Sequence, residues 1–181
     1  MSPRRRSGDV EHPYPPHRCR GKRGNVDHDD ITWTGPAGEF KYRAAAVIRD
    51  GDRILVCAVE HIDGWFLPGG RVHFGESSAQ ALTRELREEL AADVTVTGPP
   101  FLITEGIRDQ DGVLHQEVSC YYALGHHVLP GPVTDRGGHR FRWLRLADLD
   151  SANFLPPEIA AHLADEPTGT RHVVFDRRTP R

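Results

Sequence analysis

The alternation of apolar and polar positions along the chain predicts several short β-strands and one amphipathic helix. Over residues 76–91, four apolar side chains recur at intervals of three and four positions, the spacing of one helix face: Ala79, Leu82, Leu86 and Leu90. Strands are expected at residues 40–49, 53–59, 94–96, 101–107, 113–124, 126–129, 139–143 and 173–175, and further short helices at 147–150 and 157–163. Short strands mixed with few helices favour an α/β fold in which a mixed sheet packs between helices.

The composition divides the chain into three parts. Residues 1–38 are rich in Arg, Pro, His, Gly and Asp and show no apolar period, which predicts a disordered, basic N-terminal arm. The folded domain is expected to span residues 39–165. Residues 166–181 are expected to form a C-terminal tail that includes the short edge strand at 173–175.

The charge is unevenly distributed, although the formal net charge is only −3. The first 24 residues hold seven Arg and Lys against Asp9 and Glu11, so they carry about +5 and the remaining chain about −8. Two interpretations of this arm stay open, a solvated tail and a weak polyanion-binding segment. The modest net charge gives no reason to expect a specific nucleic-acid partner or an anionic membrane.

The cysteines and the apolar runs bear on location. The three cysteines, Cys19, Cys57 and Cys120, form no C-x-x-C pair, and their odd number indicates reduced thiols in a cytoplasmic protein. No apolar segment reaches 18 residues, so no membrane-spanning helix is expected.

Three glutamates are concentrated on one face of the predicted helix. Glu85, Glu88 and Glu89 are spaced i, i+3 and i+4, and the like charges of Glu85 and Glu89 repel each other. One interpretation is a solvated acidic face. The other is a site for a hard cation such as Mg²⁺, which takes oxygen ligands and is typically shared with substrate phosphates.

The residues around the helix favour the second interpretation. The loop Leu67-Pro68-Gly69-Gly70 precedes the helix, and its two glycines allow backbone shapes that bring it close to a ligand. The segment from Gly70 to Glu89 resembles the signature of the Nudix hydrolases, G-x5-E-x7-R-E-U-x-E-E-x-G-U, where U is a bulky apolar residue. The matching residues are Gly70, Glu76, Arg84, Glu85, Leu86, Glu88 and Glu89.

Two positions depart from that signature. Ala91 stands where the family has glycine, and Ala92 stands where it has a bulky apolar residue. The glycine normally ends the helix because it accepts a left-handed conformation. Its replacement predicts a longer or frayed helix end, and leaves the metal ligands unaffected.

The resemblance implies an α/β/α sandwich and hydrolysis of a nucleoside diphosphate linked to another moiety. It implies that Mg²⁺, or Mn²⁺ in its place, is held by Glu85, Glu88, Glu89 and the carbonyl of Gly70. Arg84 is expected to orient these glutamates by pairing with Glu76 or Glu85. Glu85 is the commonest base within the signature, whereas other family members place the base elsewhere.

Beyond the fixed positions of the signature, five residues are candidates for the site. Glu117 is a candidate metal ligand or base, with an outward-facing strand carboxylate as the alternative. Arg43 and Arg71 are candidates for binding phosphates, with solvated surface positions as the alternative. Trp65 and Phe66 are candidates for stacking on a base, with core packing as the alternative.

Three functions compete at this point. The first is a Mg²⁺-dependent Nudix pyrophosphohydrolase acting on a small nucleotide: a nucleotide sugar, an ADP-ribose-like compound or a (d)NTP. The second is a non-catalytic Nudix domain that senses a nucleotide or serves as an interaction module; such domains usually have a degraded signature, whereas all three helix glutamates are present here. The third is nucleic-acid binding through residues 1–38. The resemblance also suggests a homodimer.

Overall fold

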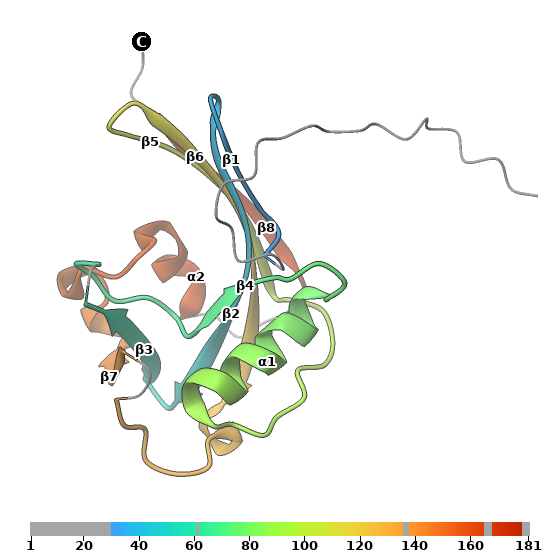
Figure 1. Cartoon of the computed structure of the whole chain (residues 1–181). Helices are drawn as coiled ribbons and strands as arrows, with labels where there is room; N and C mark the ends of the chain where they lie inside the picture. Colours follow the sequence, from blue (N-terminus) through green and yellow to red (C-terminus); the bar gives the residue numbers. More distant parts are fainter. Residues whose placement is uncertain (1–29, 61, 136–137, 165–167, 179–181) are drawn as a thin grey trace, which may run out of the picture.

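The two longest strands, β2 (Gly38–Asp50) and β6 (Val113–Gly125), run parallel to each other at the centre of a mixed eight-stranded sheet (Figure 1). The computed structural model describes residues 30–60, 62–135, 138–164 and 168–178. The strand order is β7–β3–β2–β6–β5–β8, and β1 and β4 also pair with β2. The other strands are β1 (Thr32–Gly35), β3 (Arg53–Val59), β4 (Gly69–Arg71), β5 (Leu102–Gln110), β7 (His139–Arg145) and β8 (Arg171–Arg177).

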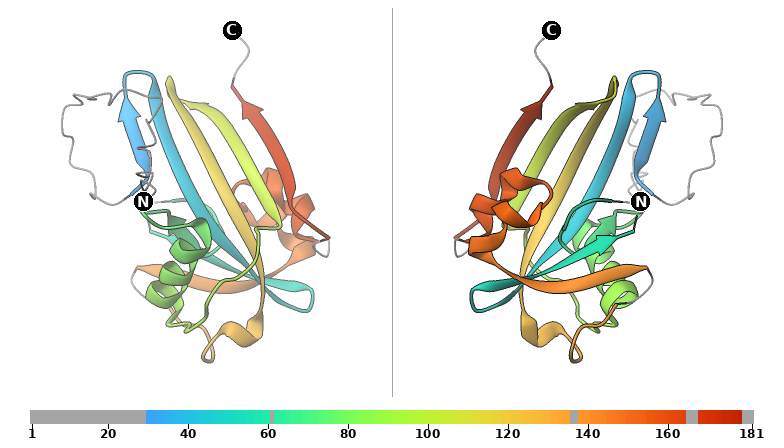
Figure 2. Two further views of the ribbon diagram at one scale, coloured as in Figure 1. Left: turned by 90° about the vertical axis from the view of Figure 1, so that its right-hand side faces the viewer. Right: turned by 90° about the vertical axis from the view of Figure 1, so that its left-hand side faces the viewer.

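The alternation within β2 separates two cores. Ala44, Ala46 and Ile48 pack toward helix α1 (Ser78–Leu90). Ala45 and Val47 face the other side, which is covered by the 3₁₀ helices η2 (Leu146–Asp148), η3 (Asp150–Ala152) and η4 (Pro157–Ile159) and by helix α2 (Ala160–Leu163). The two opposite views of Figure 2 show α1 over one face of the sheet and α2 over the other. The predicted α/β/α sandwich is therefore confirmed.

Strands β2 and β3 separate from each other, and we call the opening between them the fork. The loop that carries Gly69 and Gly70 and precedes α1, the signature loop, begins there. Strands β2 and β3 pair only at Arg49↔Ile54 and Asp50↔Arg53. Beyond these pairs the segment 66–71 enters between them: Cys57 of β3 exchanges two backbone hydrogen bonds with Phe66 (2.8 and 2.9 Å), and β4 pairs with β2. The loop before α1 is thus part of the sheet and has a defined position.

Helix α1 begins and ends with specific caps. Ser77 and Gln80 form a capping box, in which each side chain accepts a hydrogen bond from the other residue's backbone N–H. At the other end Ala91 adopts a left-handed conformation (φ 52°) and donates its N–H to the carbonyl of Arg87. The prediction of a longer or frayed helix end was wrong, because Ala91 takes the glycine-like conformation itself, at a cost of about 1 kcal/mol.

Three expectations about the chain outside α1 need correction. Residues 30–38 were assigned to the disordered arm, but Thr32–Gly35 forms β1 on the edge of β2; residues 1–29 lie outside the described part. Residues 94–96 form no strand, because the Val96 N–H bonds to the Thr83 hydroxyl of α1 (3.0 Å). Residues 126–128 form the 3₁₀ helix η1 (His126–Val128), since β2 ends beside Gly125 and offers no further partner.

The later elements follow the expectations more closely. The edge strand predicted at 173–175 is longer, as β8, and pairs in parallel with β5. The helices expected at 147–150 and 157–163 appear as η2, η3, η4 and α2. Among the described residues the α-helices have 13 and 4 residues, and neither is long and apolar enough to cross a membrane.

Candidate active site

The guanidinium of Arg84 connects the signature loop to the carboxylates of α1. Its Nε and Nη2 donate to the two carboxylate oxygens of Glu76 at 2.9 and 3.0 Å, and its Nη1 donates to Glu85 Oε1 at 2.8 Å. Nη2 also donates to the carbonyl oxygen of Arg71 at 3.0 Å. The hydrogen bonds from Arg84 lower the pKa of Glu76 and those carboxylates raise the pKa of Arg84. Arg84 thus donates hydrogen bonds to both glutamates, and its role in orienting them for a metal stays a prediction.

Gly70 makes room for Glu85. A Cβ atom at Gly70 would lie 2.2 Å from Glu85 Oε1, far inside van der Waals contact. Gly69 has a different requirement, since its φ is +134° and a Cβ there would lie 2.3 Å from the carbonyl oxygen of Ala44. The missing side chain of Gly70 therefore leaves space for the Glu85 carboxylate, and that of Gly69 lets the loop pack closely against β2.

Glu89 is the most buried of the helix carboxylates, with 9% of the residue exposed. Its Oε2 accepts a hydrogen bond from the Gly69 N–H (3.1 Å), and its Oε1 lies 3.4 Å from Nε2 of His139 on β7. Burial, and then the charge of Glu85, raise the pKa of Glu89 to about 7, against the opposing effects of the Gly69 hydrogen bond and the Arg43 charge. Glu88 differs, since its side chain is 59% exposed.

Arg43 lies beside this cluster on the central strand. It is half-buried and sits opposite Arg71 of β4 and Ser119 of β6. Its charge reaches Glu89, whose pKa it lowers. Among the described residues no carboxylate lies within ion-pair distance of Arg43, so its guanidinium keeps donors for an anionic ligand.

Trp65 and Phe66 lie in the segment that enters the fork. Trp65 packs with the core on the α2 side, and the guanidinium carbons of Arg142 and Arg140 lie 4.8 and 5.8 Å from its ring centroid. Phe66 is half-buried and bonds to Cys57 through its backbone.

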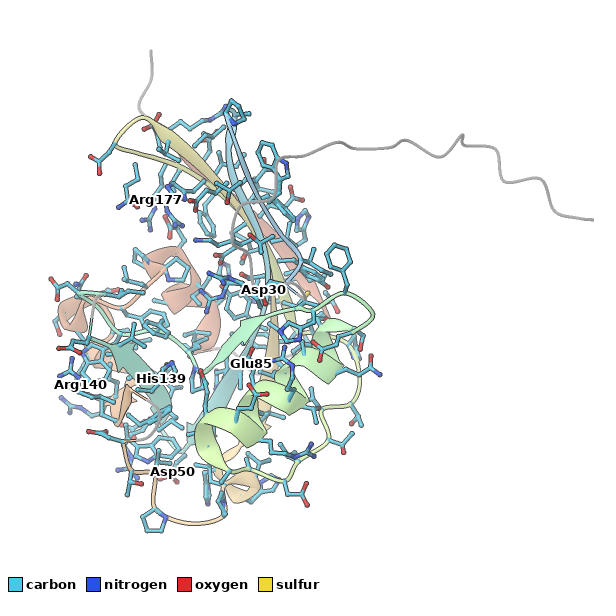
Figure 3. The ribbon with its side chains drawn as sticks, in the orientation of Figure 1. Asp30, Asp50, Glu85, His139, Arg140 and Arg177 are labelled. Atoms are coloured by element: carbon cyan, nitrogen blue, oxygen red, sulfur yellow. The ribbon has the colours of Figure 1, made fainter. Side chains whose placement is uncertain are left out.

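Figure 3 shows Arg140 and His139 near each other on β7, and Glu85 on α1.

Glu117 lies on β6, on the same face of the sheet as Arg43 of β2. On β6 it alternates in phase with Tyr121, whose side chain belongs to the core on the α2 side. Its Oε1 accepts a hydrogen bond from the Ser119 hydroxyl at 2.8 Å. No contact within the described part of the chain joins Glu117 to the glutamates of α1, so its metal role stays a prediction.

Two side chains of the site were missed by the sequence analysis. His139 was treated only as the start of a strand, and Asp30 was assigned to the arm. Asp30 forms an ion pair with Arg71 (2.8 Å), and its carboxylate lies 3.2 Å from Nε2 of His73. Neither contact has a local signal in the sequence. Asp30 and Arg71 are 41 residues apart along the chain. His139 lies on β7, whereas its neighbour Glu89 lies on α1.

The donor set of the site suits a hard divalent cation. Within the described residues no group of three or more His, Cys, Asp and Glu side chains stands arranged around a common point. Three carboxylates nevertheless share one helix face, and repulsion by Glu85 and Glu88 contributes to the raised pKa of Glu89. A bound cation relieves that repulsion, and oxygen ligands are those that Mg²⁺ and Mn²⁺ prefer.

A separate hollow lies at the far end of the sheet. It has a volume of about 940 Å³ and is lined mainly by the turns β1–β2 and β5–β6, with Asp176 and Arg178. None of the signature residues lines it. Of its charged residues, Asp176 and Arg178 bond to each other, and Asp109 accepts a hydrogen bond from the Gly112 N–H. The chemistry therefore places the candidate site at α1 and the fork.

Comparisons with known proteins identify the family of this chain. A model of the NUDIX domain matches residues 39–165. The putative 8-oxo-dGTP diphosphatase 2 of Mycobacterium tuberculosis is 31% identical over 119 residues, which are 64% of this chain and 79% of that protein. The MutT Nudix hydrolase of Burkholderia pseudomallei has a similar fold, with a TM-score of 0.55 at 23% identity over 70% of this chain and 98% of that one.

The MutT protein of Bacillus halodurans shares the fold as well, with a TM-score of 0.53 at 16% identity over 75% of this chain and 90% of that one. At these identities the two solved structures support the fold alone. The family model carries the assignment, because it spans more than half of the chain and includes the segment from Gly70 to Glu89. The chain thus belongs to the Nudix family of hydrolases, enzymes that act on phosphoanhydride bonds.

Proposed function

We propose that the protein is a Mg²⁺-dependent pyrophosphohydrolase that cleaves a nucleoside diphosphate linked to another moiety, with Mn²⁺ as a substitute metal. The observation that carries this proposal is the arrangement of Arg84, Glu85 and Glu89 around the loop at Gly69 and Gly70. The hydrogen bonds of Arg84 and of the Gly69 N–H orient these carboxylates before any ligand binds. Location in the cytoplasm and a homodimer remain predictions.

Each residue of the cluster has a role in this proposal. Glu85, Glu88, Glu89 and the carbonyl of Gly70 would hold the cation. When bound, the cation neutralises phosphate oxygens and makes a water molecule more acidic. Glu85 accepts the proton of the attacking water if the base lies within the signature. Glu89 is the alternative base, because its pKa of about 7 suits proton transfer near neutral pH.

The substrate is expected to lie between the signature and the central strand. Arg43 would bind a phosphate group, because it is near Glu89 and has no carboxylate partner among the described residues. Arg71, whose side chain is 48% exposed, would offer the donors that Asp30 leaves unused. Trp65 and Phe66 would contact the base, and Glu117 would supply an additional ligand or base from β6.

The relative from Mycobacterium tuberculosis makes an oxidised nucleoside triphosphate the first substrate to test. That relative is named a putative 8-oxo-dGTP diphosphatase, and the match extends over 79% of its length. Nucleotide sugars and ADP-ribose-like compounds belong to the same chemical class, since each has a phosphoanhydride next to a nucleoside. Each of them would offer phosphate oxygens to a bound cation and to the guanidinium of Arg43.

Phosphate release from a nucleotide panel, with Mg²⁺ or Mn²⁺, tests this function. The panel contains 8-oxo-dGTP, dGTP, ADP-ribose, UDP-sugars and dinucleoside polyphosphates. The proteins are the wild type, Glu88→Gln and, as a matched control on the opposite side of the sheet, Glu158→Gln. We expect turnover by the wild type and the control, and a loss of at least about 100-fold in Glu88→Gln.

Three further results make the test decisive. Reaction in ¹⁸O-water is expected to label a phosphate product, since water attacks phosphorus without a covalent intermediate. The pH–rate profiles of Glu85→Gln and Glu89→Gln identify the base, because only loss of the base removes the acidic limb. Nucleotide binding without turnover of any compound would refute the hydrolase and support a nucleotide sensor.

A further inference from the structure

The N-terminal segment outside the matched domain reaches the catalytic loop. We propose that Asp30 is a positioning residue for the metal centre, which it supports by clamping the signature loop through Arg71 and His73. This inference rests on the proposed function, because the group that Asp30 positions is the Arg84–Glu85 pair. The matched domain begins at residue 39, so Asp30 lies before it.

The contacts of Asp30 are short and shielded. Its Oδ2 accepts a hydrogen bond from Arg71 Nη1 at 2.8 Å, and its Oδ1 lies 3.2 Å from His73 Nε2. The Asp30 side chain is only 9% exposed. One carboxylate thus holds two side chains of the loop, where solvent screens the charges less than at the surface.

Backbone pairing determines where Asp30 lies. Asp30 and His73 form an antiparallel bridge. Next to it, the Ile31 N–H donates to the Val72 carbonyl (2.8 Å), and the Tyr42 N–H donates to the Ile31 carbonyl (3.2 Å). Residues 31 and 72 therefore both bond to β2, and β1 continues that pairing along β2. The position of Asp30 follows from the sheet, not from its own side chain.

The two residues held by Asp30 are the same two whose backbones support the centre. The carbonyl of Arg71 accepts the Arg84 Nη2–H at 3.0 Å. The N–H of His73 donates to Glu76 Oε2 at 3.1 Å, the oxygen that Arg84 Nη2 also contacts. Arg84 in turn holds Glu85. A loop that loses Asp30 therefore loosens the position of Arg84 and, through it, of a metal ligand.

The test compares Asp30→Asn with the wild type in the full chain. Mn²⁺ affinity is measured by paramagnetic resonance, and kcat and KM are measured on the best substrate. Because Asn keeps the size but loses the charge, we expect about tenfold weaker Mn²⁺ binding and about tenfold lower kcat, with KM little changed. The control Asp148→Asn removes the Arg145–Asp148 pair, a two-bond Asp–Arg pair away from the signature, and is expected to match the wild type.

Two companion variants separate positioning from folding. Asp30→Glu keeps the charge and is expected to recover most of the Mn²⁺ affinity. His73→Gln removes one of the two side chains that Asp30 contacts. It is expected to weaken Mn²⁺ binding, but by less than Asp30→Asn does. Thermal unfolding of each variant shows how much of the effect is stability, and His73→Gln replaces Asp30→Asn in the test if the latter does not fold.

The outcomes are distinct from those of the proposed function. If the wild type turns over substrate and Asp30→Asn binds Mn²⁺ and reacts as Asp148→Asn does, the inference is wrong and the hydrolase stands. A lower unfolding temperature with unchanged Mn²⁺ affinity and kcat also overturns it, since the role is then structural. If the wild type neither binds Mn²⁺ nor hydrolyses any compound, the proposed function fails and the positioning role fails with it.

Discussion

At the middle of α1 the guanidinium of Arg84 holds Glu76 and Glu85, whereas one turn later Glu89 is buried with a backbone N–H and His139 as its partners. The hydrogen bonds from Arg84 lower the pKa of Glu76. Burial raises the pKa of Glu89 to about 7. Identical side chains within one signature are therefore kept in different electrostatic states.

The difference shows what each half of the signature contributes. The Arg84 half fixes the positions of Glu76 and Glu85 by hydrogen bonds, which under the proposed function prepares Glu85 to bind a metal ion. The Glu89 half keeps a carboxylate that ionises only near neutral pH in the metal-free protein, and so it disfavours the charged state until a cation binds. Four substitutions break or sharpen this comparison, in descending order of expected effect.

Gly70→Ala breaks the Arg84 half most completely. The added Cβ would lie 2.2 Å from Glu85 Oε1, so the carboxylate must leave Arg84. We expect kcat to fall about 100-fold, because small displacements of catalytic groups have effects of this size. Unfolding by urea is expected to change by less than about 1 kcal/mol, since the displaced atoms are the end of a flexible side chain.

Gly131→Ala is the control for that substitution. No atom lies within 4 Å of the Cβ position at Gly131, so activity and stability are both expected to match the wild type. Full activity of Gly70→Ala would show that the observed place of Glu85 does not matter for the reaction.

Glu89→Gln tests the other half through stability. Because the pKa of Glu89 is raised from 4.5 to about 7 in the folded protein, the wild type loses stability as the pH rises through this window, and the loss is complete above it. Gln cannot ionise, so metal-free Glu89→Gln is expected to be more stable than the wild type by about 3 kcal/mol at pH 8. The advantage disappears at about pH 4, where Glu89 is protonated in both states.

Urea unfolding at the two pH values, without metal, measures this difference. Glu88→Gln is the matched control, because the Glu88 side chain lies on the same helix and is 59% exposed. An equal advantage of Glu89→Gln at both pH values would refute the electrostatic explanation, and so would the absence of any advantage at high pH.

Arg84→Lys sharpens the comparison by keeping the positive charge and removing the planar guanidinium. A lysine ammonium lacks the fixed set of donors with which the guanidinium bonds both oxygens of Glu76 and also Glu85. We expect Mn²⁺ affinity to weaken about tenfold, measured by titration. Arg145→Lys, at the two-bond Arg145–Asp148 pair, is expected to leave the affinity unchanged. Wild-type affinity in Arg84→Lys would mean that charge alone orients the glutamates.

Ala91→Gly has the smallest expected effect and concerns the helix end beyond Glu89. Ala91 has a φ of 52°, which glycine adopts without strain, so the substitution is expected to stabilise the protein by about 0.5–1 kcal/mol without changing kcat. Ala79→Gly, inside the same helix, is the control and is expected to destabilise it by about 1 kcal/mol. Equal signs for the two substitutions would contradict the role given to the left-handed cap.

The sequence predicted the parts of the fold that depend on neighbouring residues. The stripe of Leu82, Leu86 and Leu90 placed the buried face of α1, and alternation in 40–49 placed β2, because both patterns arise within one element. The strands expected at 94–96 and 126–129 were wrong, since short apolar runs need a neighbouring strand to pair with, and none is available there.

By itself the sequence determined the helix with its three glutamates, because that spacing lies within one element. Its match to the Nudix signature indicated the family and implied the partners of Arg84. Only the tertiary structure decided that Asp30 holds Arg71, that His139 lies beside Glu89, and that Glu89 is buried enough to raise its pKa. These depend on which distant strands become neighbours and on how much water the packing removes, and neither is encoded by local spacing.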